Sequence, residues 1–274
     1  MSVLMSDRVL QLSNELRHAR EEMARYGELL ETIQKSILPR QLPSVPGLDL
    51  AVHFAEAETV GGNFYDVHPI PLGRWSIVVA DVIGQGLAAA GILVLAHALG
   101  SVVQGQEAAP SPGAALAWIN HLLATRYLPN TGQLLAAFLS LYDAGPQMLT
   151  YASAGHPPPR LVRGNEVHRL DEVSGLPLGI DQASVYQEHV VRLLPSDRLV
   201  LFTDGITEST NAAHDIFGDD HLDETIRTPA STATELLHNV VAALRRFRAG
   251  QPASDDETCL VAVVKPVQQT TQVQ

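Results

Sequence analysis

The sequence contains a single cysteine, Cys259, among its 274 residues. One thiol excludes a disulfide framework and a cysteine zinc site within one chain. It is also typical of proteins from a reducing compartment, so we expect a cytoplasmic location. No apolar run reaches about 18 residues, and the first residues lack the basic and apolar segments of a secretory signal. We therefore expect no membrane association.

Positive charge is also scarce, because 18 Lys and Arg residues stand against 30 Asp and Glu residues, for a net charge of −12. Nucleic acids and anionic lipids bind basic patches, so we expect no nucleic-acid partner. The hydrophobic content of 46% predicts a globular protein with a real core. An acidic surface is compatible with divalent cations, but it does not by itself indicate a metal site.

Residues 7–38 carry apolar side chains at alternating intervals of three and four positions, with charged residues between them. This heptad pattern predicts a coiled coil, so we expect residues 1–39 to form a dimerisation and linker helix and the chain to be a homodimer. A single amphipathic helix packed on its own domain is the alternative. The apolar positions are Val9, Leu12, Leu16, Ala19, Met23, Tyr26, Leu30, Ile33 and Ile37.

From residue 40 onward, short apolar runs are separated by Gly, Pro and Asp. This pattern predicts one α+β domain over residues 40–266, with antiparallel sheets covered by helices, and a disordered polar tail at 267–274. Strands are expected at 48–55, 63–69, 75–81, 134–142, 148–153, 160–162, 185–192, 198–202 and 258–264, and helices at 87–103, 114–127 and 233–248. Thr232 and Glu235 have the spacing of a capping box at the start of the last helix.

Three acidic residues stand at the ends of apolar strands: Asp81, Asp204 and Asp255. A carboxylate beside a buried strand requires compensation. A hard cation with oxygen ligands would provide it, and so would a turn or a helix cap formed by the same Asp. If the three acids converge, they would repel one another strongly without a metal between them. For any one of them, the residues alone leave both explanations open.

Five short motifs follow one another in a fixed order, and together they resemble the metal-dependent protein phosphatases of the type 2C superfamily, specifically the bacterial SpoIIE/RsbU branch. The resemblance runs from about Ile33 to Val264. It implies an α/β/β/α sandwich of two antiparallel sheets with two Mn²⁺ or Mg²⁺ ions at one end. The motifs are Gly61-Gly62-Asn63-Phe64-Tyr65-Asp66, Ala80-Asp81-Val82-Ile83-Gly84-Gln85-Gly86, Ala154-Gly155-His156-Pro157-Pro158, Phe202-Thr203-Asp204-Gly205-Ile206-Thr207-Glu208 and Asp255-Asp256-Glu257-Thr258, preceded by Gln34-Lys35-Ser36-Ile37-Leu38-Pro39.

The resemblance also implies roles for individual residues. Asp81 would bridge the two metal ions, and the Val82 carbonyl would bind one of them. Asp204 and Asp255 would complete the shell, with Asp256 as the alternative to Asp255. Catalysis would proceed through a metal-activated water, on phosphoserine or phosphothreonine of a STAS-type anti-sigma-factor antagonist in partner-switching signalling.

Asn63 departs from the family pattern, which has an aspartate at this position to help hold the second metal ion. An asparagine keeps one carbonyl oxygen but loses a full charge, so the second ion should bind more weakly. Asp66 is a poor replacement, because on a strand it would point to the opposite face. Two functions therefore stay open: a working phosphatase with a higher metal requirement, or a weakly active or inactive pseudophosphatase that serves as a phosphoprotein-binding regulatory module.

Overall fold

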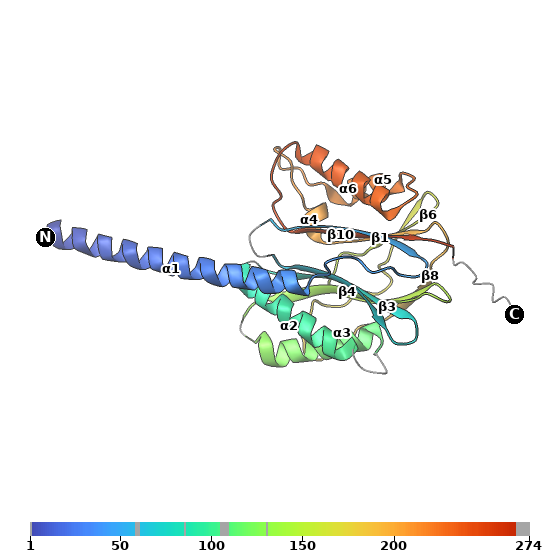
Figure 1. The fold of residues 1–274 in the computed structure, drawn as a ribbon, viewed down its shortest axis with the longest axis horizontal. Helices are drawn as coiled ribbons and strands as arrows, with labels where there is room; N and C mark the ends of the chain where they lie inside the picture. The colour runs from blue at the N-terminus through green and yellow to red at the C-terminus, as the bar shows by residue number, and fades with distance from the viewer. Residues whose placement is uncertain (1, 58–60, 85, 105–109, 130, 267–274) are drawn as a thin grey trace.

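Two five-stranded antiparallel sheets lie face to face in this computed structural model, which describes residues 2–57, 61–84, 86–104, 110–129 and 131–266 (Figure 1). One sheet has the strand order β1-β10-β9-β6-β7 and the other has the order β2-β3-β4-β5-β8. The strands of the first sheet are β1 (Leu48–Ala55), β10 (Glu257–Val264), β9 (Arg198–Phe202), β6 (Arg160–Arg163) and β7 (Glu166–Arg169). The strands of the second are β2 (Asn63–Ile70), β3 (Arg74–Ile83), β4 (Leu134–Asp143), β5 (Met148–Ala154) and β8 (His189–Arg192).

The central core lies between the two sheets. Successive residues of a strand point to opposite faces, so alternate side chains enter this core. Ile77 and Val79 of β3 and Leu260 of β10 do so and are fully buried there. Asp81, two positions after Val79, therefore belongs to the inward face of β3.

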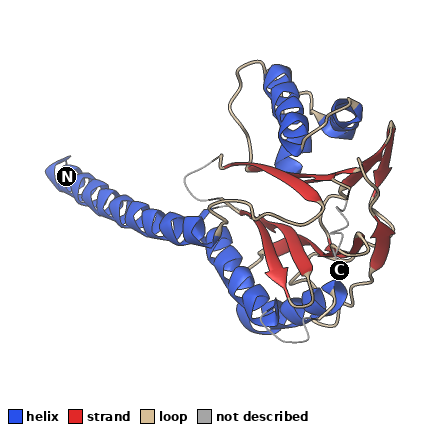
Figure 2. Ribbon diagram, turned by 45° about the vertical axis from the view of Figure 1, so that its right-hand side comes forward, coloured by secondary structure: helices blue, strands red, loops and turns tan. Residues whose placement is uncertain are grey.

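Helices cover both outer faces, which completes the four layers (Figures 1 and 2). Helices α2 (Gly86–Gln104) and α3 (Pro112–Leu122), with the π-helical turn Leu123–Tyr127 after α3, cover the β2–β8 sheet. The other sheet is covered by α5 (Gly218–Arg227) and α6 (Ala233–Arg248), while the short helix α4 (Asp204–Thr207) follows β9. This arrangement confirms the α+β fold class and the predicted α/β/β/α sandwich.

The N-terminal segment is one helix, α1 (Ser2–Ile37), which projects away from the sandwich (Figure 1). Its C-terminal end packs against α2. Leu16, Met23 and Tyr26 on the projecting part are 54%, 62% and 61% exposed. The predicted helix is confirmed, whereas its pairing with a second copy stays a prediction, as do the predicted domain limits.

Most predicted elements agree with the structure, and the differences have local causes. The strand expected at 185–192 begins only at His189, because the residues before it hold the start of α3, where the Gly113 amide donates to Glu188 Oε1 at 2.7 Å. Helix α5 was not predicted, since only Leu222 and Ile226 of its ten residues are buried. The predicted cap is present: the Glu235 amide donates to Thr232 Oγ1 at 3.1 Å.

Within the described part of the chain, no helix combines the length and the apolar character needed to cross a membrane. Cys259 is buried and free. The predicted disordered tail at 267–274 lies outside the described residues.

Candidate metal centre

The three acids predicted from strand ends belong to one end of the sandwich. Asp81 lies near the end of β3, in register opposite Asn63 of β2. Asp204 is the first residue of α4, two positions after the end of β9, and Asp255 stands two positions before the start of β10. Because β9 and β10 are antiparallel neighbours, the end of one strand and the start of the other meet at the same edge.

The strand-end placement of these acids is reflected in the pKa values of two of them. Burial raises the pKa of Asp81 to about 8, and the carboxylates of Asp204, Asp255 and Asp256 act in the same direction. Burial, followed by repulsion from Asp255, also raises the pKa of Asp204. Acids behave in this way when they share a site without a compensating positive charge. Their donor chemistry fits a hard divalent cation, which would favour the ionised carboxylates.

The ligand geometry is not preassembled. Among the residues that the structure describes, no group of three or more His, Cys, Asp or Glu side chains is arranged to hold a metal ion as it stands. Asp255 illustrates why no such group is assembled. It is exposed, and its Oδ1 already accepts a hydrogen bond from the Asp256 amide at 2.8 Å.

Asp256 has a different environment from Asp255. It is only 7% exposed. Its Oδ1 accepts from the Ala57 amide at 2.8 Å, and its Oδ2 accepts from the Gly62 amide at 2.6 Å. A Cβ atom on Gly61 would lie 2.3 Å from Oδ2, so this close approach requires glycine. Asp256 therefore anchors the backbone before β2, and Asp255 is the better candidate ligand.

Gly62 brings the same backbone against Asp81. The Val82 amide donates to the Gly62 carbonyl at 3.0 Å. A Cβ atom on Gly62 would lie 3.4 Å from Asp81 Oδ1 and 3.2 Å from the Val82 carbonyl oxygen. Gly62 thus touches both of the candidate ligands on β3, and its lack of a side chain leaves them uncovered on this side.

The Asn63 side chain connects the two sheets. It is 1% exposed, and its Nδ2, which has two hydrogens to donate, lies within hydrogen-bond distance of three acceptors: Thr203 Oγ1 at 2.8 Å, the Asp256 carbonyl at 3.0 Å and Thr258 Oγ1 at 3.1 Å. All three acceptors belong to the β9–β10 edge. An aspartate here would face the Asp256 carbonyl, which cannot donate a hydrogen bond. This structural use of the neutral amide was not visible in the sequence.

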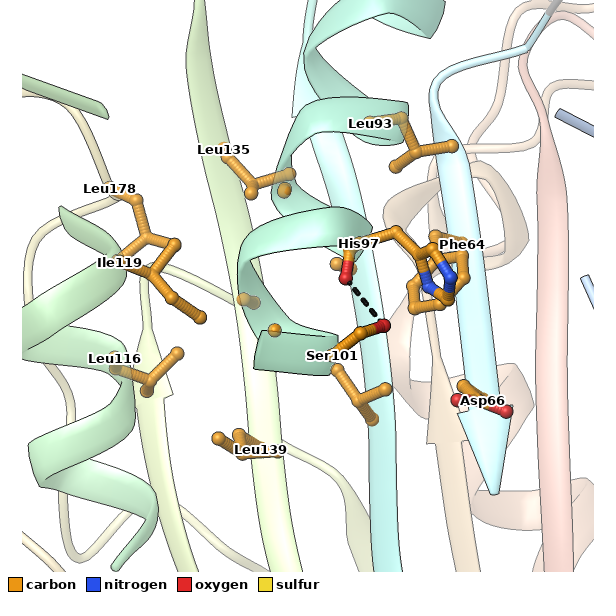
Figure 3. A pocket seen from close by; sticks show the side chains of 15 residues that line it. Phe64, Asp66, Leu93, His97, Ser101, Leu116, Ile119, Leu135, Leu139 and Leu178 are labelled. Atoms are coloured by element: carbon orange, nitrogen blue, oxygen red, sulfur yellow. Dashed lines mark hydrogen bonds between the residues drawn. The ribbon is translucent and has the colours of Figure 1, made fainter. Parts of the chain in front are cut away.

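Asp66 lies on the opposite face of β2 from Asn63, as strand alternation predicted. Its Oδ2 lies 2.8 Å from His68 Nδ1. It lines a cavity of about 60 Å³ between the β2–β8 sheet and helices α2 and α3. Figure 3 shows His97 beside Phe64 in this cavity, and the two ring centroids are 5.2 Å apart. Among the described residues that line it, Asp66 alone is formally charged and none is a Lys, Arg, Asn or Gln, so these residues do not offer the cationic or amide donors that a phosphate group requires.

His156, in the Gly-His-Pro turn, has a buried, structural setting. It is 5% exposed, and its Nδ1 lies 2.8 Å from the Pro157 carbonyl oxygen. Burial lowers the pKa of His156 to about 4, so the imidazole is neutral near pH 7. Its Nε2 is buried and has no hydrogen-bond partner in the described part of the chain.

A family model described as Stage II sporulation protein E (SpoIIE) matches residues 71–265. The chain belongs to the SpoIIE family. Phosphoserine phosphatase RsbU of Bacillus subtilis is 27% identical to this SpoIIE-family chain over 253 residues, which cover 90% of the chain and 72% of RsbU. Protein IcfG of Synechocystis sp. is 26% identical over 257 residues, which cover 85% of the chain but only 40% of IcfG. The chain thus spans less than half the length of IcfG.

Solved structures with the same fold include the SiaA-PP2C domain of Pseudomonas aeruginosa. It has a TM-score of 0.78 at 24% identity and covers 90% of this chain and 99% of that domain. The RsbU and RsbW domains of Rv1364c from Mycobacterium tuberculosis have a TM-score of 0.70 at 22% identity, with 85% of this chain and 64% of that chain covered. These likenesses establish that the SpoIIE-family chain has the type 2C phosphatase fold.

Proposed function

We propose that this SpoIIE-family chain is a metal-dependent serine/threonine protein phosphatase. The observation that carries the proposal is that Asp81, Asp204 and Asp255, from three distant segments, stand at strand ends on one edge of the sandwich, where Asp204 and Asp255 both act to raise the pKa of Asp81. Three carboxylates at one edge suit divalent cations with a preference for oxygen ligands, and Mn²⁺ and Mg²⁺ have this preference. The relatives support it, since RsbU is named a phosphoserine phosphatase and RsbX was solved in complex with magnesium.

The proposed centre holds two Mn²⁺ or Mg²⁺ ions. Asp81, the Val82 carbonyl, Asp204 and Asp255 would hold these ions, and Asn63 would stand at a degenerate ligand position. Such ions neutralise the charge of the phosphoryl group and activate water for attack, so no nucleophilic side chain is required. Bound cations would favour the ionised forms of Asp81 and Asp204, whose pKa values are raised without metal.

The proposed substrate is a phosphoserine or phosphothreonine side chain of a regulatory protein, and specifically of a STAS-type anti-sigma-factor antagonist in partner switching. The placement of the acids supports a protein substrate. Asp255 is exposed and Asp204 is half-buried, so the site opens at the surface. A phosphorylated side chain presented by a partner could reach such an edge. The names of RsbU and of phosphoserine phosphatase RsbP support phosphoserine as the hydrolysed group.

We further propose that the chain is a cytoplasmic homodimer held together by α1. The exposed apolar side chains of Leu16, Met23 and Tyr26 on a projecting helix support this pairing, because an isolated helix with such a stripe gains stability by burying it. Sedimentation equilibrium at micromolar concentration should give a dimer for the wild type and a monomer for Met23→Glu. A wild-type monomer would refute the pairing.

Asn63 supports a second candidate function, that of a weakly active or inactive phosphoprotein-binding module. Its amide nitrogen is already used by three acceptors at the β9–β10 edge, so the side chain is adapted to joining the sheets. A chain of this kind would bind the phosphorylated partner without turning it over at any metal concentration.

A Mn²⁺ titration of p-nitrophenyl phosphate and phosphoserine-peptide hydrolysis separates the two functions. The phosphatase proposal expects activity that depends on Mn²⁺ and falls to background in Asp81→Asn and in Asp204→Asn. Asp66→Asn is the matched control, since it removes a carboxylate from β2 on the face away from the site, and it should keep wild-type activity. Activity that survives Asp81→Asn would refute the proposed centre, and stoichiometric binding of a phosphoprotein without turnover would favour the second function.

A further inference from the structure

Gln34 reverses the ordinary burial pattern of helix α1. It is 0% exposed, whereas its apolar neighbours Ile33 and Ile37 are only half-buried. Side-chain amides are seldom fully buried, and a buried amide requires hydrogen-bond partners. The place where this amide is satisfied therefore shows what the residue does.

The amide reaches out of the helix to the loop that precedes β2. Gln34 Nε2 donates to the Gly61 carbonyl at 2.9 Å. The other end of the amide, Oε1, is buried without a hydrogen-bond partner in the described part of the chain. An apolar side chain of similar volume would avoid this unsatisfied oxygen, so stability alone does not explain a glutamine here.

Gly61 leads directly to the candidate metal ligands. The next residue, Gly62, donates to Asp256 Oδ2 at 2.6 Å and accepts from the Val82 amide at 3.0 Å. Gly62 also lies against Asp81 Oδ1 and the Val82 carbonyl oxygen. Gln34 thus fixes one side of the glycine pair, Asp256 fixes the other, and the pair defines the wall beside Asp81.

We propose that Gln34 is a positioning residue of the metal centre, which holds the Gly61–Gly62 backbone against Asp81 and the Val82 carbonyl. The inference rests on the proposed function in one respect only, namely that these two groups bind the metal. Gln34 acts through the backbone and touches neither substrate nor metal. Without its hydrogen bond, Gly61 and Gly62 keep the Asp256 contact but lose the restraint from α1.

Gln34→Met is the test variant, because methionine fits the buried volume and removes both amide atoms. Thr32→Met is the matched control on the same helix, where the exposed Thr32 hydroxyl donates only to the Glu28 carbonyl. Hydrogen exchange of the metal-free proteins reports the backbone, and calorimetric titration with Mn²⁺ reports the centre. Neither measurement requires turnover.

In Gln34→Met we expect amide exchange at Gly62 and Val82 to rise about five-fold, the amount that one ordinary hydrogen bond contributes. The apparent Mn²⁺ affinity should fall by about the same factor, while the melting temperature of the metal-free protein should change little, because the Gly61 carbonyl loses its donor but the unsatisfied Gln34 Oε1 is also removed. Thr32→Met should match the wild type in all three measurements.

Unchanged amide exchange at Gly62 and Val82 in Gln34→Met would overturn the positioning role of Gln34 but not the proposed function. So would a lower melting temperature with unchanged Mn²⁺ affinity, because that combination describes a merely structural residue. A wild type that binds Mn²⁺ but hydrolyses no phosphoester would refute the proposed function and leave the positioning role to be decided by exchange and affinity. A wild type that binds no Mn²⁺ would overturn the proposed function together with the metal-related half of the inference.

Discussion

Asn63→Asp places the aspartate that the family resemblance leads us to expect at this position, and the structure predicts two opposing effects. Without metal, the Asp256 carbonyl loses the donor that lies 3.0 Å away and faces a carboxylate instead. Thr203 and Thr258 can turn their hydroxyl groups toward the new acid, but the carbonyl cannot. The new charge is also buried in register opposite Asp81, whose pKa is already raised.

The size of the first effect follows from these contacts. Loss of a donor to one buried acceptor costs about 1–3 kcal/mol, and the repulsion from Asp81 adds to it. We expect a loss of about 3 kcal/mol in the free energy of unfolding near neutral pH, which corresponds to about 6–12 °C in melting temperature for a chain of this size. The loss should shrink toward about pH 5, where the buried acid can take up a proton.

Metal should reverse the loss. With excess Mn²⁺ the new carboxylate gains a cation, so Asn63→Asp should recover most of its melting temperature and reach half-maximal hydrolysis at a lower Mn²⁺ concentration than the wild type. Differential scanning calorimetry in EDTA and in Mn²⁺ measures the first outcome, and the p-nitrophenyl phosphate titration measures the second.

Asn120→Asp is the matched control for this experiment. Asn120 is also fully buried; its Nδ2 donates to the Asp181 carbonyl at 2.7 Å and its Oδ1 accepts from the Gly179 amide at 2.9 Å. The same substitution there should destabilise the protein equally with and without Mn²⁺. If Asn63→Asp is as stable as the wild type in EDTA, the hydrogen bonds of Asn63 do not hold the sheets together. If Mn²⁺ stabilises Asn63→Asp no more than Asn120→Asp, position 63 does not face the metal.

Three further predictions concern stability. Gly100→Ala should raise the free energy of unfolding by about 1 kcal/mol, because an added Cβ meets open space inside α2. The measurement is the melting temperature, which should be higher than that of the wild type. Arg160→Met should lower the free energy of unfolding in urea by about 3–5 kcal/mol, since the fully buried guanidinium pairs with Asp223 at 2.8 Å and with Asp219 at 2.7 Å. A change within experimental error would contradict this prediction. The pKa of His156 is about 6.5 in the unfolded chain and about 4 in the folded protein, so the unfolded chain takes up the proton first as the pH falls. The free energy of unfolding should therefore fall by on the order of 3 kcal/mol between about pH 6.5 and about pH 4. His156→Gln should lack that part of the acid-induced loss, and an unchanged pH profile would contradict the assignment.

The acids could be predicted because their signals are local. Asp81 and Asp204 each follow an apolar strand within a few positions, and strand alternation alone places Asp66 on the wrong face of β2. The layers were predictable for the same reason, since a period of two marks strands and a period near 3.6 marks α2 and α6. Helix α5 escaped prediction because most of its face is polar and only two of its side chains are buried.

The neutral residues could not be predicted, because their partners are distant in sequence. Asn63 is 140 positions from Thr203 and 195 from Thr258, while Gln34 is 27 from Gly61. The sequence shows Asn63 only as a neutral residue where an aspartate is expected. It shows Gln34 only as one polar position in a charged helix. In the fold, both amides are buried donors at the same edge: Asn63 joins the sheets, and Gln34 joins α1 to the glycine pair.

This difference bears on how the asparagine should be interpreted. A site that had merely lost an acid would leave a vacant or unsatisfied position, whereas the amide of Asn63 finds acceptors on both threonines and on the Asp256 carbonyl. Asp256 in turn holds Gly62, and Gly62 lies against Asp81. The neutral side chain therefore supports the same wall that Gln34 restrains from the other side. A chain with this arrangement can keep the backbone around Asp81 in place without metal, and weaker metal binding than in Asn63→Asp is the expected consequence.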